Sequence, residues 1–265
     1  MAFLNDISLG QYYPQQSFFH RLDPRTKLIA VFCQMTGLLI SFKASVLLMF
    51  IVVTALMAAS SRVPLGLLLK NLRPFIWLFL FTLLVHLLWT EGRVIAHLPL
   101  IRATITAEGA FLGLIYSLRL ALLIVIAALL TLTTSPVELT DALERLLKPL
   151  KRLRAPVHEI VMMLTLSLRF IPTLLEEAQR IKNAQMSRGM SFEGSLIRRM
   201  KNIVPLILPL FFSAFRRADE LAMAMDSRCY TGGEGRTSFR RLSFKTADYL
   251  VLLLSLALFV PAALL

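Results

Sequence analysis

Apolar runs separated by short charged segments occupy the first half of the chain and its last twenty residues. A helix of about 20 mostly apolar residues is long enough to cross a bilayer. The first two runs are shorter and surround Ser41-Phe42-Lys43, so we expect two spans joined by a tight turn. Residues 90–108 are mixed and weakly charged, and we expect a loop there. The pattern predicts about five membrane-spanning helices, at 28–40, 44–59, 74–89, 109–133 and 246–265.

Residues 134–245 have a different, amphipathic pattern. The segment Ser135-Pro136-Val137-Glu138 indicates a helix start, because Ser and Glu cap free amides and Pro suits the first helical position. Leucines then recur on one helical face and charged residues on the other, which is typical of a helix at a membrane surface. Two longer helices are predicted at Pro156–Gly189 and Ser195–Arg228.

Each longer helix contains an apolar stretch, Ile160–Leu175 or Ile203–Phe215, that is shorter than a membrane span. We expect both stretches to lie obliquely against the face of the bilayer, with short tilted spans as the alternative. The predicted all-α membrane protein therefore has four parts: a cytoplasmic N-terminal segment (1–27), four spans (28–133), a cytoplasmic-side module of long amphipathic helices (134–245) and a last span (246–265).

Composition and charge distribution support a membrane protein. The 265 residues are 57% hydrophobic, which is more than a soluble domain usually contains. Of the 29 Lys and Arg residues, 19 lie within 134–245, without the interleaved stacking aromatics that mark nucleic-acid binding. Basic loops face the cytoplasm, so we expect a multi-pass cell-membrane protein with a cytoplasmic N-terminus and no nucleic-acid partner. The charged N-terminus lacks a cleavage site, and we expect no signal peptide.

A short pattern occurs twice within the module, forty positions apart. Ala184-Gln185-Met186-Ser187-Arg188-Gly189 is matched by Ala224-Met225-Asp226-Ser227-Arg228-Cys229. Each copy closes a predicted helix with a small residue, an arginine, and another small or turn-prone residue. We therefore expect two helices that each present one arginine at the C-terminal end.

Three features within the predicted spans call for a structural or functional explanation. Arg119 lies in the fourth span, where a charge is costly, so it is either functional or paired with a helix-end carbonyl for structural reasons. His86 lies near the end of the third span and is expected at the membrane interface. Gly109 and Gly113 are four positions apart, a spacing that allows helices to pack closely.

Residue patterns for catalysis are missing from the sequence. The two cysteines, Cys33 and Cys229, and the four histidines have no metal-ligand spacing. No Gly-rich phosphate loop precedes a Lys-Ser or Lys-Thr pair, and no nucleophile-elbow serine is present. We therefore expect a protein without catalytic, cofactor-binding or metal-binding residues that acts on a partner.

The sequence resembles the transmembrane T component of energy-coupling factor (ECF) transporters, the modular importers of vitamins and transition metals. The resemblance covers nearly the whole chain and is strongest at the two arginine tripeptides. The family carries two Ala-Arg-Gly motifs at the ends of two crossing coupling helices, and Ser187-Arg188-Gly189 and Ser227-Arg228-Cys229 stand in their places. Cys229 stands where the family has glycine, a difference that concerns how the second helix ends. The resemblance also rests on Gly10–Tyr12, His20–Lys27, Leu132–Leu139 and Leu168–Thr173.

The resemblance implies a coupling subunit that is not an enzyme. Such a T component would join two cytoplasmic ABC-type ATPases, which bind the ATP, to one substrate-binding S component in the membrane. Arg188 and Arg228 would each dock in a groove on one ATPase and pair with carboxylates there. Closure of the ATPase pair would draw the helix ends together and shift their apolar halves against the S component.

The N-terminal Gln11–Pro14 stretch and the chain length resemble the T component shared by vitamin S components more than one dedicated to cobalt, nickel or biotin. The dedicated type stays an alternative. An ordinary ABC importer permease is disfavoured, because Gln179 and Asn183 replace the Ala and Gly of its ATPase-contacting loop. A membrane-embedded lipid enzyme would need clustered Asp or His, which the sequence does not offer.

Overall fold

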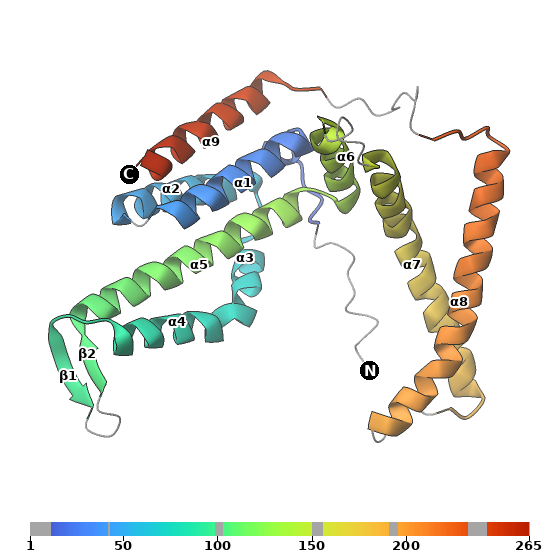
Figure 1. The fold of residues 1–265 in the computed structure, drawn as a ribbon, viewed down its shortest axis with the longest axis horizontal. Helices are drawn as coiled ribbons and strands as arrows, with labels where there is room; N and C mark the ends of the chain where they lie inside the picture. Colours follow the sequence, from blue (N-terminus) through green and yellow to red (C-terminus); the bar gives the residue numbers. More distant parts are fainter. Residues whose placement is uncertain are drawn as a thin grey trace. The chain divides into compact units, whose positions relative to one another are not determined.

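The computed structural model describes residues 12–41, 43–98, 103–149, 156–190, 196–232 and 243–264. Helices form most of the described chain, as predicted for an all-α membrane protein (Figure 1). They are α1 (Pro24–Ile40), α2 (Ala44–Ser61), α3 (Leu65–Leu72), α4 (Ile76–Trp89), α5 (Ala107–Thr133), α6 (Pro136–Leu147), α7 (Val157–Ser187), α8 (Leu196–Asp226) and α9 (Thr246–Leu264), with 3₁₀ turns η1 (Phe19–Arg21) and η2 (Arg73–Phe75).

The expectation of a loop at residues 90–108 is wrong. An antiparallel hairpin of β1 (Val94–Leu98) and β2 (Ala103–Thr106) joins α4 to α5, with His97 opposite Thr104. Both strands are rich in β-branched Val, Ile and Thr, which favour extended backbone. The third expected span, 74–89, is covered by the turn η2 and α4, and the short helix α3 precedes it.

The chain forms two compact units. The apolar unit comprises residues 10–142 and 241–265, and the α7–α8 unit comprises residues 1–9 and 143–240. In the apolar unit, α1, α2, α5 and α9 pack around a core that includes the fully buried Phe50 and Ile126. Large apolar side chains such as Phe32, Trp77 and Leu253 remain exposed on its surface, as expected of helices that face lipid.

Four segments of the described chain are long and apolar enough to cross a membrane: 44–61, 65–89, 107–133 and 157–187. The first three correspond to predicted spans. The fourth contains the stretch Ile160–Leu175, which we expected to lie obliquely against the bilayer. At 17 residues α1 falls below this length, and α9 contributes a shorter apolar stretch, 246–260.

Gly109 and Gly113 bring α4 and α5 into close contact, as their spacing predicts. A Cβ atom at Gly109 would lie 2.5 Å from the carbonyl oxygen of His86, and one at Gly113 would lie 3.1 Å from that of Leu83. The His86 ring stacks on Tyr116 of α5, with ring centroids 4.5 Å apart. His86 therefore contributes to the packing of these two helices.

Two of the segments that carry the family resemblance meet at one end of the apolar unit. The Tyr13 amide donates to the carbonyl of Leu132 (3.0 Å), and the buried Lys27 ammonium donates to that of Thr133 (2.9 Å). The His20 ring lies 2.9 Å from the Tyr13 carbonyl, so Nε2 carries a hydrogen. Burial lowers the pKa of His20, which favours the neutral ring. These contacts hold the segment before α1 against the end of α5.

The starts of α1 and α9 are joined at the same end. Asp23 caps α1, and its carboxylate also pairs with Arg25 (2.8 Å). The carboxylate of Asp248 accepts from the backbone amides of Asp23 (2.9 Å) and Lys245 (2.7 Å). A buried carboxylate with two amide donors fixes both helix starts, because each amide would otherwise be left without a partner.

The predicted start of α6 is confirmed as a capping box. The Glu138 amide donates to Ser135 Oγ (3.3 Å), and the Ser135 amide donates to Glu138 Oε2 (3.4 Å).

Ser135→Ala is expected to lower the free energy of unfolding by about 1 kcal/mol, because an N-terminal amide of α6 loses its acceptor. Thermal denaturation of the purified chain in detergent measures this loss. Ser60→Ala is the matched control, since the exposed Ser60 hydroxyl only donates to a carbonyl of its own helix. An equal shift in both variants would contradict a capping role for Ser135.

Candidate functional site

α7 and α8 run antiparallel and cross each other (Figure 1). At the crossing, Glu177 accepts hydrogen bonds from Ser213 (2.6 Å) and Arg217 (3.1 Å). Further along, the Tyr230 hydroxyl, just after α8, donates to the sulfur of Met162 on α7 (3.1 Å). The order of these contacts along the two helices is opposite, so the end of α8 lies beside the first half of α7.

The two copies of the arginine pattern end their helices in the same way, as the sequence repeat predicts. Gly189 and Cys229 both have left-handed backbone, with φ of 83° and 56°. Each helix end has one bond to the carbonyl three residues back and one that spans five residues. These are Gly189 N–H to Met186 (3.0 Å), Met190 N–H to Gln185 (3.1 Å), Cys229 N–H to Asp226 (2.9 Å) and Tyr230 N–H to Met225 (3.1 Å). Such bonds satisfy carbonyls that a helix end otherwise leaves free.

Cys229 therefore replaces the family glycine without changing how α8 ends. A residue with a Cβ in left-handed backbone is strained by about 1–2 kcal/mol relative to glycine. The Cys229 thiol is free and exposed, so no disulfide offsets this strain within the described chain.

Cys229→Gly is expected to stabilise the α7–α8 unit by about 1 kcal/mol, because glycine adopts left-handed backbone without strain. Slower hydrogen exchange of the Cys229 and Tyr230 amides would report this change. Gly189→Ala is the reciprocal variant and should destabilise the end of α7 by a similar amount. Faster exchange in Cys229→Gly would show that the thiol has a stabilising contact.

Arg188 and Arg228 have exposed side chains at distant points of the helix pair. Arg228 lines the same groove as Arg169 of α7, whereas Arg188 lies 19 residues beyond Arg169, or about 30 Å at 1.5 Å per residue. The two arginines are therefore too far apart to bind one small ligand together. They are suited to contact two separate partners.

The serine before each arginine has the same local role in both copies. Ser187 Oγ donates to the carbonyl of Asn183 (3.1 Å), and Ser227 Oγ donates to that of Met223 (2.7 Å). Each hydroxyl thus bonds within its own helix, four residues back. The adjacent arginine keeps an exposed side chain at each helix end.

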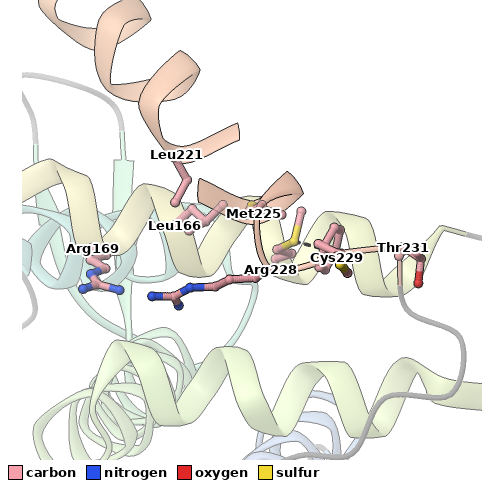
Figure 2. Close-up of a pocket in the computed structure, with 10 residues that line it drawn as sticks. Leu166, Arg169, Leu221, Met225, Arg228, Cys229 and Thr231 are labelled. Atoms are coloured by element: carbon pink, nitrogen blue, oxygen red, sulfur yellow. Dashed lines mark hydrogen bonds between the residues drawn. The ribbon is translucent and has the colours of Figure 1, made fainter. Parts of the chain in front are cut away.

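A groove of about 440 Å³ lies beside Arg228, between α7 and the end of α8 (Figure 2). Sequence reasoning missed this groove, because it depends on how the two helices cross. Its walls are mostly apolar, and its charged side chains are both arginines. The lining residues are Met162, Leu166, Arg169, Leu221, Met225, Arg228, Cys229, Tyr230, Thr231 and Gly232.

A chain of polar contacts holds the end of α8 in place. The Tyr230 hydroxyl lies 3.4 Å from His158 Nε2, and His158 Nδ1 lies 3.0 Å from a carboxylate oxygen of Glu144 on α6. Neither Tyr230 nor His158 was singled out from the sequence as a site residue. Together they position the backbone that carries Arg228.

Arg119 is buried in the apolar unit, at 6% exposure, and donates to the carbonyl of Ser41 (2.6 Å) at the end of α1. Its guanidinium also lies 5.3 Å from the Tyr116 ring centre. Of the two readings left open by the sequence, this geometry favours the structural one, an arginine paired with a helix-end carbonyl. Across the described ranges, no group of three or more His, Cys, Asp or Glu side chains is arranged to hold a metal ion.

Comparison with known proteins identifies one family over most of the chain. The sequence profile of the CbiQ family, described as "Cobalt transport protein", matches residues 15–239. Three similar proteins are each named "Energy-coupling factor transporter transmembrane protein EcfT". The one from Acidaminococcus fermentans is 49% identical over 264 residues, covering 98% of this chain and 97% of the relative. That from Bacillus subtilis is 46% identical (99% and 98% covered), and that from Heliobacterium modesticaldum is 51% identical (94% and 93%).

Proposed function

This chain belongs to the CbiQ/EcfT family, the transmembrane components of energy-coupling factor transporters, and on that premise we propose that it couples two ABC-type ATPases to an S component. As a transporter subunit it is a membrane protein and not an enzyme. The permease of an ordinary ABC importer and a lipid enzyme are thereby set aside.

The observation that carries the proposal is the repeated helix end. Two exposed arginines, Arg188 and Arg228, follow two long helices, and both helices end in the same hydrogen-bond pattern. A guanidinium can bind a carboxylate through two parallel hydrogen bonds, which gives a strong, directional contact that can transmit force between subunits. Because the two helix ends are alike and lie about 30 Å apart, they are suited to bind two separate but similar partners.

ATP is bound by the partner ATPases in this proposal, and closure of their pair draws the two helix ends together. The motion reaches the S component through the apolar face of α8, where Ile207, Phe211 and Phe215 are exposed. Residues 134–245 act from the cytoplasmic side, and the N-terminus is cytoplasmic, in agreement with the clustering of Lys and Arg in the module. The complex resides in the cell membrane.

The S component selects the substrate, and we propose vitamins as the substrate class. Support comes from the 43–51% identity to relatives whose names specify no metal. The description of the family as cobalt transport proteins keeps a dedicated cobalt or nickel T component as the second candidate, with biotin beside it.

Co-purification tests the proposal. The tagged chain is expressed with its neighbouring genes and extracted in mild detergent, and the proteins retained are identified by mass spectrometry. Two ATPases and at least one small membrane protein are expected. Several different small partners would identify the shared vitamin type, and a single one would identify the dedicated type. Recovery of the chain without an ATPase would refute the coupling function.

A further inference from the structure

The groove beside Arg228 is built from two matching helix faces. Met162, Leu166 and Arg169 are spaced i, i+4 and i+7 on α7, so they lie on one face. At the end of α8 the spacing is the same and so is the order of residue types: two apolar side chains on the helix are followed by an arginine two residues after its last residue, Asp226. These residues are Leu221, Met225 and Arg228.

Two cations thus share one groove whose lining includes no carboxylate. Figure 2 shows the Arg228 side chain extending towards Arg169 along the groove. Neither guanidinium has a hydrogen bond or an ion pair with any residue that the structure describes. Like charges that face one groove repel each other, so the arrangement favours an occupant that carries negative charge.

The position of Arg169 in the sequence leads to the same conclusion. It is the single charged residue in the stretch Ile160–Leu175, where every neighbour is apolar or uncharged. A charge in an otherwise apolar helix segment needs a polar partner to offset its cost. No residue that the structure describes supplies this partner, so we expect an anionic group of another molecule at the groove.

We propose that Arg169 is a second docking residue for the ATPase that binds Arg228. In this proposal, which rests on the proposed function, the groove accepts an ATPase segment with carboxylates for the two arginines and apolar side chains for the methionine and leucine walls. The Arg188 end differs, because Ile181, Gln185 and Arg188 occupy the matching positions and Gln185 replaces the apolar Met225. The two ATPases are thus held in different ways.

A double-mutant cycle in lipid nanodiscs tests the proposal. The full chain with its S component is captured on a surface, and the two purified ATPases are titrated at several salt concentrations. The variants are Arg169→Gln, Arg228→Gln, Arg188→Gln and the doubles that combine Arg169→Gln with each of the other two. Arg180→Gln is the matched control, because Arg180 lies on the same helix with an 81% exposed side chain.

Arg169→Gln is expected to weaken ATPase binding about tenfold, the usual size of one charge-assisted hydrogen bond. The double variant of Arg169→Gln and Arg228→Gln should weaken ATPase binding by less than the product of the two single-variant factors, because both arginines contact one partner. In the double variant of Arg169→Gln and Arg188→Gln, the two factors should multiply. Wild-type binding in Arg169→Gln beside weak binding in Arg228→Gln would overturn this inference and leave the proposed function intact. Unchanged binding in all three single variants would overturn both.

Two further measurements separate docking from other roles of Arg169. The melting temperature of Arg169→Gln should equal or exceed that of the wild type, because the substitution removes a repulsion; a decrease would reveal a structural role and overturn the proposal. Bound phosphatidylglycerol is counted by native mass spectrometry. Loss of this lipid from Arg169→Gln with unchanged ATPase binding would assign the groove to a lipid phosphate and likewise overturn the proposal.

Discussion

Arg188→Glu is expected to abolish ATPase capture at the end of α7 and to stop substrate uptake. The substitution places a carboxylate where the partner is proposed to present carboxylates, so an attraction becomes a repulsion. Its effect on folding should be small, because the Arg188 side chain is exposed and α7 is ended by the left-handed Gly189. Co-purification of the ATPases and uptake by cells measure the two effects.

Arg180→Glu is the control for this charge reversal. Arg180 lies two helical turns before Arg188 on α7 and approaches Glu176 only at 3.9 Å, a weak surface contact. The Arg180→Glu variant should retain ATPase binding and substrate uptake. In Arg228→Glu, co-purification of the second ATPase should be lost. Normal uptake in Arg188→Glu would refute the docking role of this helix end.

Gly109→Val is expected to disrupt the packing of α4 against α5 and to destabilise the apolar unit by about 3 kcal/mol, the upper part of the range for an overpacked site. The first added carbon would lie 2.5 Å from the His86 carbonyl oxygen. That oxygen belongs to helix backbone and accepts the Thr90 amide, so it cannot move aside cheaply. Loss of monodisperse protein in detergent, or a large fall in melting temperature, measures the effect.

Gly66→Ala is the matched glycine control. Gly66 lies within α3, and no atom stands within 4 Å of a Cβ added there. Alanine should stabilise this helix slightly, because it favours helical backbone more than glycine does. Similar losses of stability in Gly109→Val and Gly66→Ala would show that glycine at position 109 is not required for the close approach of α4 and α5.

Local sequence signals predicted the features that depend on neighbouring residues. Asp23 before Pro24 and Ser135 before Pro136 specify helix starts within four residues, and both cap their helices. The repeat around Arg188 and Arg228 predicted two alike helix ends for the same reason. The apolar runs predicted most helices because lipid-facing and buried positions both favour apolar residues.

Features that depend on distant residues could not be predicted in this way. Arg119 bonds to Ser41, 78 positions earlier, and no local pattern indicates that pairing. The groove at Arg228 arises only because α7 and α8 cross antiparallel, which brings Arg169 into it. The hairpin before α5 was missed because its short strands carry a weak alternation compared with the long apolar runs around them.

The exposed thiol of Cys229 is an attachment point for a spectroscopic probe just after the end of α8. The sequence has only one other cysteine, so Cys33→Ser leaves a single site for a spin label. Gly189→Cys would place a second label at the matching end of α7, where the surroundings are open and Cys229 shows that such a left-handed position accommodates cysteine, at about the cost expected for Gly189→Ala. Pulsed dipolar spectroscopy on such a pair would record the distance between the two ends as the partner ATPases bind and hydrolyse ATP, and so test whether the two ends move together as proposed.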